Sequence, residues 1–231
     1  TIGTASVSGN SYSWSPSVGL NSTTIAQPTA SPSSTQTYTV TVTAANGCTA
    51  SDVVVVNVNT TTPTVNAGPD KNLNCTTTST TIGTAAISGN TYSWAPSTGL
   101  SSTIVAQPTA NPTVTTTYTV TVTGSNGCTA TDFVTVNVNT TLPTANAGPD
   151  KNLDCTTTST TIGTVGISGN TYAWSPTTGL NASNVAQPIA SPSLTTTYTV
   201  TVTGSNGCTA SDIAVVNVSI AVPVANAGLD K

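Results

Sequence analysis

The side chains of this chain that could support chemistry are those of cysteine and aspartate. The 231 residues include five cysteines and no histidine, and the seven acidic residues are all aspartates. Cys48, Cys128 and Cys208 are 80 residues apart, and Cys75 and Cys155 keep the same spacing. A zinc site is not indicated, because histidine and Cys-x-x-Cys pairs are both missing from the sequence. Cysteines that recur in this way favour disulfides, and therefore an oxidising, extracellular location.

The connectivity of these cysteines follows from where a β-sandwich would place them. Cys75 comes just before the first turn of its repeat, and Cys128 just after the last turn, at opposite poles. A strand of ten residues spans about 33 Å, whereas a disulfide needs Cα atoms within about 7 Å. We therefore expect Cys75 to pair with Cys208 of the next repeat, with Cys155, Cys48 and Cys128 pairing with other repeats. Pairing of Cys75 with Cys128, free thiols and links between chains remain open.

The aspartates are the only carboxylates, so a general base or a metal site would have to use them. Serine and threonine hydroxyls are plentiful, but without an activating base they are poor nucleophiles. We therefore expect no enzymatic activity and no cofactor, with calcium as the one candidate ion. The candidate calcium ligands are the aspartates expected near the same pole of each sandwich, namely Asp70, Asp132, Asp150 and Asp212. The alternative is that these aspartates cap turns or pair with lysines.

The positions of these residues are set by an 80-residue repeat, which Trp14, Trp94 and Trp174 also follow. A unit of this length lies in the normal range for an independent domain. We expect repeat 1 at residues 1–59 without its first strand, repeat 2 at residues 63–139 and repeat 3 at residues 143–218. Residues 219–231 match the first strand of a following repeat.

The strongest local signal in each repeat is a closing β-hairpin. From Thr117 to Val138, apolar and threonine residues alternate on both sides of a Gly-Ser-Asn-Gly turn. The same hairpin recurs at Thr37–Val58 and Thr197–Val218. About seven short strands in each full repeat predict an all-β fold of tandem, immunoglobulin-like antiparallel sandwiches. The core that we expect in repeat 2 consists of Ile82, Ile87, Tyr92, Trp94, Leu100, Val105, Tyr118, Val120, Val122, Val134, Val136 and Val138.

The composition excludes several classes of partner. Charged residues make up 4% of the chain and the net charge is −4, so the basic surface that nucleic acids need is missing. No apolar run is long enough to insert into a membrane. An outward apolar stripe on the last strand of each repeat is either a second packed face of a twisted strand or a lateral contact between chains. It consists of Val53, Val55, Phe133, Ile213 and Val215.

Three segments carry a resemblance to a known class of repeat. They are NAGPDKNLNC at residues 66–75, NTYSWAPSTGL at residues 90–100 and the hairpin TTTYTVTVTGSNGCTATDFVTVNV at residues 115–138. Together they resemble the immunoglobulin-like, PKD-related (polycystic-kidney-disease-type) repeats of giant bacterial surface proteins, such as gliding-motility adhesins. The resemblance covers essentially the whole chain. It implies a cell-surface spacer without catalytic activity.

These observations favour a structural, extracellular repeat protein that forms a rod or filament. Its expected partners are neighbouring repeats or copies of itself, and residues 220–231 could complete repeat 1 of the next copy, head to tail. The simpler explanation is that the sequence is a window of a longer repeat chain. The alternative function is an adhesin whose loops contact a glycan or another cell, for example at Asn21, Ser101 and Asn181.

Overall fold

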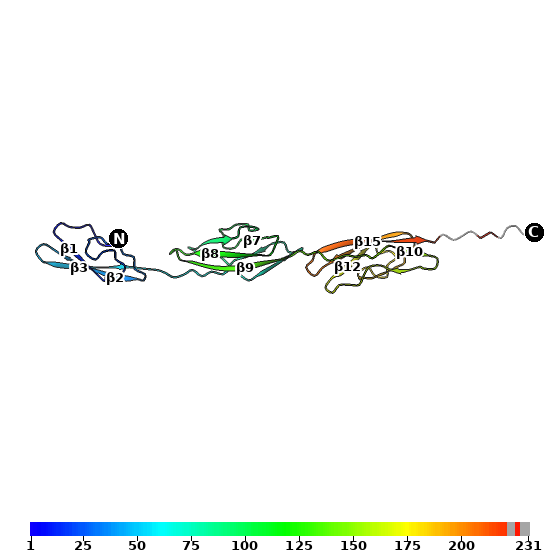
Figure 1. Cartoon of the computed structure of the whole chain (residues 1–231), viewed down its shortest axis with the longest axis horizontal. Coiled ribbons are helices and arrows are strands. Elements are labelled where there is room, and N and C mark those ends of the chain that lie inside the picture. The colour runs from blue at the N-terminus through cyan, green and yellow to red at the C-terminus, as the bar shows by residue number, and fades with distance from the viewer. Residues whose placement is uncertain (221–224, 227–231) are drawn as a thin grey trace, which may run out of the picture. The chain divides into compact units, whose positions relative to one another are not determined.

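A computed structural model of the chain describes residues 1–220 and 225–226. These residues form fifteen β-strands (Figure 1). Within this described part, no helix is long and apolar enough to cross a membrane. The chain packs into two compact units. One comprises Thr1–Val65, Ala86–Ser93 and Thr121–Thr131, and the other comprises Asn66–Ala85, Trp94–Val120 and the described residues from Asp132 onward.

Repeat 1 forms one antiparallel sheet in the order β1-β2-β3. The aromatic strand pairs with the first arm of the closing hairpin, Trp14 facing Val40. The second arm places Asp52 opposite the same valine. The strands are β1 (Ser11–Ser15), β2 (Gln36–Thr43) and β3 (Thr49–Val56).

Repeats 2 and 3 each form a four-stranded sheet and a two-stranded sheet. In repeat 2 the orders are β4-β9-β8-β6 and β5-β7, and in repeat 3 they are β10-β15-β14-β12 and β11-β13. The strands of repeat 2 are β4 (Lys71–Asn74), β5 (Thr80–Thr81), β6 (Thr91–Ala95), β7 (Thr109–Ala110), β8 (Thr116–Thr123) and β9 (Thr129–Asn139). Those of repeat 3 are β10 (Lys151–Asp154), β11 (Thr160–Thr161), β12 (Thr171–Ser175), β13 (Ile189–Ala190), β14 (Thr196–Thr203) and β15 (Thr209–Ser219).

The core of repeat 3 shows why the fold is a sandwich. Ala190 of β13 and Ile162, next to β11, pack against the inward side chains of the four-stranded sheet. Two aromatic rings fill the middle and also bind the long connection between β12 and β13. The Trp174 indole donates to the Val185 carbonyl at 2.9 Å, and the Tyr198 hydroxyl donates to the Thr178 carbonyl at 2.7 Å. Buried aromatics with a satisfied polar group therefore organise a connection that has little regular structure.

The all-β fold of tandem sandwiches is confirmed, but the strands differ in detail from the expected ones. The described part of each full repeat has six strands rather than about seven, and its first strand is parallel to the last, Lys71 facing Val136 in repeat 2. Residues 1–7 of repeat 1 form no strand. The corresponding strand of repeat 2 is limited to Thr80–Thr81, because Gly83 has a φ of +81° and turns the chain. The strand expected at residues 219–231 lies mostly outside the described residues.

The expected core of repeat 2 is largely confirmed. Ile87 and Val105 are the exceptions, with 50% and 43% of their surface exposed. Their backbones face the aromatic rings instead: the Ile87 N–H donates to the Tyr92 hydroxyl at 2.8 Å, and the Val105 carbonyl accepts from the Trp94 indole at 2.9 Å. Tyr92, Leu100 and Val138 are half-buried. Seven of the expected residues are buried: Ile82, Trp94, Tyr118, Val120, Val122, Val134 and Val136.

Gly163 offers a test of how closely the chain packs beside the tryptophan. It has a φ of +82°, and a β-carbon there would collide with the Ala186 carbonyl and lie 3.0 Å from the Trp174 ring. We expect Gly163→Ala to lower the free energy of unfolding by about 3 kcal/mol or more. The control Gly169→Ala, also at positive φ but 3.8 Å from the Ser205 β-carbon, should cost only about 1 kcal/mol. Urea unfolding followed by tryptophan fluorescence measures both, and equal losses would contradict the close packing.

Candidate functional site

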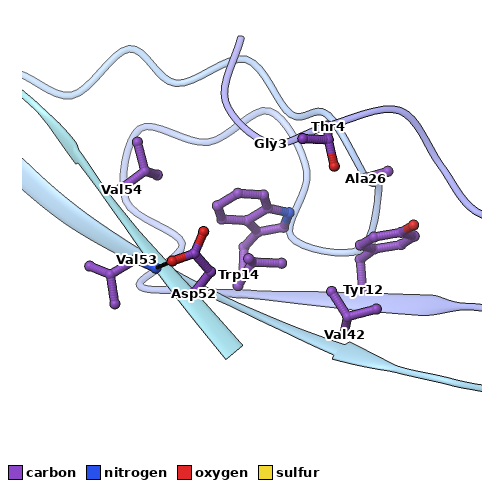
Figure 2. Close-up of a pocket in the computed structure, with 10 residues that line it drawn as sticks. Gly3, Thr4, Tyr12, Trp14, Ala26, Val42, Asp52, Val53 and Val54 are labelled. Atoms are coloured by element: carbon purple, nitrogen blue, oxygen red, sulfur yellow. Dashed lines mark hydrogen bonds between the residues drawn. The ribbon is translucent and has the colours of Figure 1, made fainter. Parts of the chain in front are cut away.

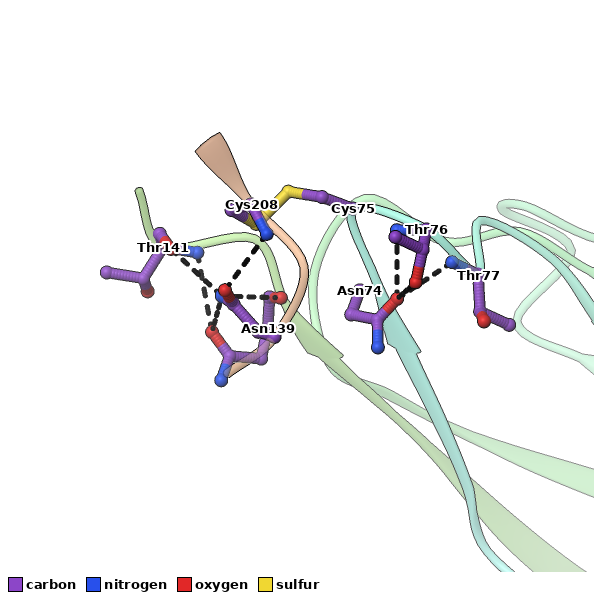
Figure 3. The surroundings of a disulfide bond; sticks show 8 residues. Asn74, Cys75, Thr76, Thr77, Asn139, Thr141 and Cys208 are labelled. Carbon is purple, nitrogen blue, oxygen red and sulfur yellow. Dashed lines mark hydrogen bonds between the residues drawn. A yellow bond between two sulfur atoms is a disulfide. The ribbon is translucent and has the colours of Figure 1, made fainter. Parts of the chain in front are cut away.

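A disulfide between Cys75 and Cys208 connects repeat 2 to repeat 3 (Figure 3). Cys75 directly follows β4, and Cys208 directly precedes β15. Their Cα atoms are 4.9 Å apart, and the two cysteines are 133 positions apart in sequence. The structure therefore joins neighbouring repeats and does not pair Cys75 with Cys128 of its own repeat. In the described part of the chain the other cysteines are free thiols; Cys48 and Cys155 are exposed, and Cys128 is half-buried.

Hydrogen bonds from Asn206 reinforce this junction. Its side-chain amide donates to the Asn139 Oδ1 atom at 3.0 Å and to the Thr141 carbonyl at 2.9 Å. Its own Oδ1 atom accepts from the Cys208 N–H at 3.2 Å. The turn of repeat 3 also lies against Thr76, since a β-carbon on Gly207 would come within 2.6 Å of the threonine methyl. The residues that connect repeats 2 and 3 are therefore bound to the turn that carries Cys208.

The turn of repeat 2 binds the connection that precedes it in the same way. The Asn126 amide donates to the carbonyls of Asn59 and Thr61 at 3.1 and 2.9 Å. Its Oδ1 atom accepts from the Cys128 N–H at 3.1 Å, and the Cys128 Sγ atom lies 3.9 Å from the Asn59 carbonyl. Cys128 thus has the surroundings of Cys208 but is a thiol. Partners for Cys48, Cys128 and Cys155 in other repeats remain a prediction.

A polar side chain at the end of the first strand holds the turn that presents each first-strand cysteine. In repeat 2 the Asn74 Oδ1 atom accepts from the N–H groups of Thr76 and Thr77 and from the Thr76 hydroxyl (Figure 3). In repeat 3 Asp154 accepts the equivalent three hydrogen bonds. The hydrogen bond from the Thr156 hydroxyl, followed by those from the two backbone N–H groups, lowers the pKa of Asp154 below its ordinary value of 3.8.

The candidate calcium ligands are engaged in the sheet. In repeat 3 the Asp212 carboxylate accepts the Ala147 N–H at 2.8 Å, and the Asp150 carboxylate accepts the Val215 N–H at 2.8 Å. Asp132 and Asp70 make the same bonds in repeat 2. Among the described residues, no group of three or more carboxylate, histidine or cysteine side chains could hold a metal ion. In repeats 2 and 3 these aspartates therefore attach the segment around the first strand to the last strand.

The candidate adhesive loops use their polar side chains internally. The Asn21 Oδ1 atom accepts from the Thr29 N–H at 2.8 Å, and the Ser101 hydroxyl accepts from the Thr109 N–H at 2.9 Å. Asn181 accepts from the Ile189 N–H at 2.7 Å. These three positions therefore stabilise their own loops, and the structure gives no contact by which they select a ligand.

The apolar stripe on the last strands is solvent-exposed for the most part. The exposed fraction is 57% for Val53, 50% for Val55, 64% for Phe133 and 58% for Ile213, whereas Val215 is half-buried. Exposed apolar side chains also occur elsewhere, such as on Val165 at 80%. A lateral contact between chains at this stripe remains a prediction.

Sequence reasoning missed the asparagines that bind the junctions. Asn126 and Asn206 occupy the same place in the closing turn, two residues before a cysteine, and Asn46 holds that place in repeat 1. The recurrence of this asparagine was therefore visible in the sequence, but turn formation alone was enough to explain it.

Comparison with known proteins gives no family assignment. No family model matches this sequence, and no curated protein is similar to it. Among solved structures, the chain is similar to extracellular domains 3–5 of Drosophila OTK at 11% identity and a TM-score of 0.39, covering 91% of this chain and 85% of that one. Mouse cadherin-23 EC22-24 matches at 10% identity and a TM-score of 0.40, covering 92% and 87%. The PKD domain from KIAA 1837 protein matches at 23% identity and a TM-score of 0.30, covering 36% and 92%.

The bond between Asp212 and Ala147 gives a test that separates a structural carboxylate from a calcium ligand. We expect Asp212→Ala to lower the free energy of unfolding by about 1–3 kcal/mol, because the buried Ala147 N–H loses a charged acceptor. Asp52→Ala is the control, since Asp52 accepts the N–H of its own neighbour Val53 (Figure 2) and, among the described residues, no N–H of another strand, and it should change stability by less than about 0.5 kcal/mol. Thermal unfolding with added Ca²⁺ completes the test: a calcium-dependent rise in melting temperature that Asp212→Ala abolishes would establish a calcium site instead.

Asp154 gives a pH-dependent prediction. Its pKa is lowered in the folded chain, so its stabilising contribution is fully present above pH 3.8. This contribution disappears as the pH falls through the lowered folded pKa. A carboxyl NMR titration should give a value below 3.8, and the Thr157 amide resonance should follow the same curve. In Asp154→Asn, which copies Asn74 of repeat 2, the amide should no longer respond to acid; an Asp154 pKa at or above 3.8 contradicts the hydrogen-bonded turn.

Proposed function

We propose that the chain is a load-bearing, non-catalytic array of β-sandwich repeats that works outside the cell. The observation that supports this proposal most strongly is the Cys75–Cys208 disulfide, which adds a second covalent connection between two repeats already joined by the main chain. The hydrogen bonds of Asn206 to Asn139 and Thr141 reinforce the same junction. Two connections at separate points resist bending and twisting that a single connection would permit, so a stiff rod or filament is the form that we propose.

The position of the disulfide also determines how force passes along the chain. When the two ends are pulled, tension runs through β4 to Cys75, across the sulfur–sulfur bond to Cys208, and on through β15. Residues 76–207, which include β5 through β14, are bypassed. The aromatic cores of repeats 2 and 3 are therefore not on the path of the load. The bypassed strands are therefore loaded only through their pairing with β4 and β15.

The composition supports an extracellular location and a passive role. A disulfide forms and persists in oxidising compartments. Charged residues are only 4% of the chain, so its stability should depend little on salt, and the absence of histidine leaves few groups that titrate near neutral pH. We place the array at a cell surface, as in the PKD-related surface repeats that the sequence resembles. The polar loops at Asn21, Ser101 and Asn181 are engaged internally, which favours the structural role over adhesion.

Single-molecule pulling of the intact chain tests this function. In the disulfide-bonded protein, residues 76–207, which lie within the sequence separation of 133 positions between Cys75 and Cys208, should not contribute to the extended length. Reduction, or Cys75→Ser, should therefore lengthen the fully unfolded chain by roughly 450 Å, at about 3.4 Å per residue. Force–extension curves with and without reductant measure this difference directly.

Cys155→Ser is the matched control, because it removes an exposed thiol from the same turn of the next repeat. It should leave the extension unchanged. Cleavage after Lys71 and Lys151 of the unreduced, denatured protein gives the chemical check, since the fragments with Cys75 and Cys208 should stay linked. Equal extended lengths in the oxidised and reduced proteins would remove the basis for a load-bearing disulfide.

A further inference from the structure

The turn of each closing hairpin contains an asparagine that is followed directly by a glycine. These Asn-Gly pairs lie at residues 46–47, 126–127 and 206–207, one in each repeat. Asn-Gly is the sequence most prone to spontaneous deamidation, because glycine has no side chain to hinder its own nitrogen from attacking the asparagine carboxamide. The third of these asparagines, Asn206, is also the residue whose amide binds the connection between repeats 2 and 3. A change in its chemistry would therefore act on the junction itself.

Hydrogen bonds restrain both groups of this pair that would have to react. The Gly207 nitrogen, which would be the nucleophile, donates its hydrogen to the Gly204 carbonyl at 2.9 Å. The Asn206 Nδ2 atom, which would leave as ammonia, donates to the Thr141 carbonyl at 2.9 Å and to the Asn139 carbonyl at 3.3 Å. Deamidation of Asn206 therefore requires a local opening of the turn, as the exchange of a protected amide hydrogen does.

The disulfide limits such an opening. Cys208 lies two residues after Asn206, is fully buried and donates its N–H to the Asn206 Oδ1 atom at 3.2 Å. At the other end of the sulfur–sulfur bond, Cys75 directly precedes Thr76 (Figure 3). The Thr76 methyl group lies against Gly207, and both Asn206 and Gly207 are half-buried. While the disulfide is intact, the turn cannot move away from Thr76.

Repeat 2 contains the same turn without a disulfide. The Asn126 amide donates to the carbonyls of Asn59 and Thr61 at 3.1 and 2.9 Å, and the Gly127 N–H donates within its turn at 2.9 Å. Asn126 and Gly127 are nevertheless exposed, and a β-carbon on Gly127 would meet no atom within 4 Å. The hydrogen bonds are thus common to the two turns, whereas the cross-link belongs to the turn of repeat 3.

We propose that Asn206 is a modification site whose deamidation loosens the junction between repeats 2 and 3, and that the Cys75–Cys208 disulfide protects it. In the reaction the Gly207 nitrogen forms a bond to the Asn206 Cγ atom, the bond from Cγ to Nδ2 breaks, and the proton of the glycine nitrogen leaves with the ammonia. One water molecule then opens the succinimide ring and gives aspartate or isoaspartate. The mechanical consequence rests on the proposed load-bearing function, whereas the reaction itself does not.

The product replaces an attraction at the junction with a repulsion. A carboxylate has no hydrogen to donate, and the main-chain carbonyls of Asn139 and Thr141, which the amide now faces, are acceptors only. An isoaspartate also adds one carbon to the main chain ahead of Cys208. Because the coupling between two sites is reciprocal, an amide that the disulfide protects also protects the disulfide. Deamidation of Asn206 should therefore make the disulfide easier to reduce.

The first test follows deamidation in the full chain at neutral pH, with the disulfide intact or reduced. Cleavage after Lys71 and Lys151 then gives three fragments that each contain one Asn-Gly pair. Mass spectrometry and enzymatic methylation of isoaspartate measure the reaction in each fragment. We expect Asn206 to react about tenfold or more slowly than Asn126 while the disulfide is intact, and at a similar rate to Asn126 after reduction.

Two cysteine variants are the controls for this test. Cys75→Ser should speed the reaction of Asn206 as reduction does, whereas Cys155→Ser, which removes an exposed thiol, should leave it unchanged. The rate at Asn126 should stay the same throughout, which separates a local opening from a general loss of structure. Equal rates at Asn206 and Asn126 with the disulfide intact would overturn the proposal, and so would an Asn206 rate that does not rise on reduction.

A second test uses Asn206→Asp, which copies the aspartate product. Dithiothreitol should reduce its disulfide about fivefold or more faster than that of the unmodified chain. Asn206→Ala should have a smaller effect, because it loses the hydrogen bonds without adding a charge. Asn126→Asp, the same change in the turn without a disulfide, is the matched control and should leave the rate unchanged. An unchanged rate in Asn206→Asp would refute the loosening, while the extended length in single-molecule pulling would still test the load-bearing function separately.

Discussion

The parallel pairing of the first and last strands is the constraint on which the rest of each full repeat depends. In repeat 2, Asn74 at the end of β4 faces Asn139 at the end of β9. Both strands therefore finish at the same end of the sheet. Because the chain leaves the repeat after Asn139, Cys75 is presented where the next repeat begins. An antiparallel first strand would have sent Cys75 to the opposite end, out of reach of Cys208.

The parts of this fold that could be predicted from the sequence are those with a local signal. The closing hairpins follow from the alternation of valine and threonine around a turn, and β8 and β9 (Figure 1) fall within Thr117–Val138 to one residue. The parallel first strand has no such signal, since four residues at Lys71–Asn74 pair with a strand more than sixty positions away. Its attachment depends on the hydrogen bonds of Asp132 and Asp70, and a sequence does not distinguish such a carboxylate from a calcium ligand.

The errors in the predicted core have a common physical origin. Ile87 and Val105 are apolar, and apolar type alone placed them inside. In the structure, the half-buried ring of Tyr92 and the buried ring of Trp94 form hydrogen bonds with the backbone groups of Ile87 and Val105. A residue whose backbone faces a buried polar atom turns its side chain outward. The exposure of such a side chain then depends on the hydrogen bond that a neighbouring tyrosine or tryptophan forms with its backbone. A hydrophobic pattern does not contain this information.

The disulfide suits a chain whose sandwiches have small cores. The buried apolar residues are mostly valine and alanine, with one tryptophan in each repeat, so each domain of about 80 residues has limited apolar area to bury. A cross-link that closes a loop of 133 residues reduces the entropy of the unfolded chain, a contribution of about 5 kcal/mol in the loop-entropy treatment. Because the loop spans parts of two repeats, unfolding either one leaves its chain tethered to the other. The junctions between repeats therefore contribute to the stability of this array, as the cores do. The junction residues Cys75, Cys208 and Asn206 stabilise the folded chain in addition to their role in the proposed function.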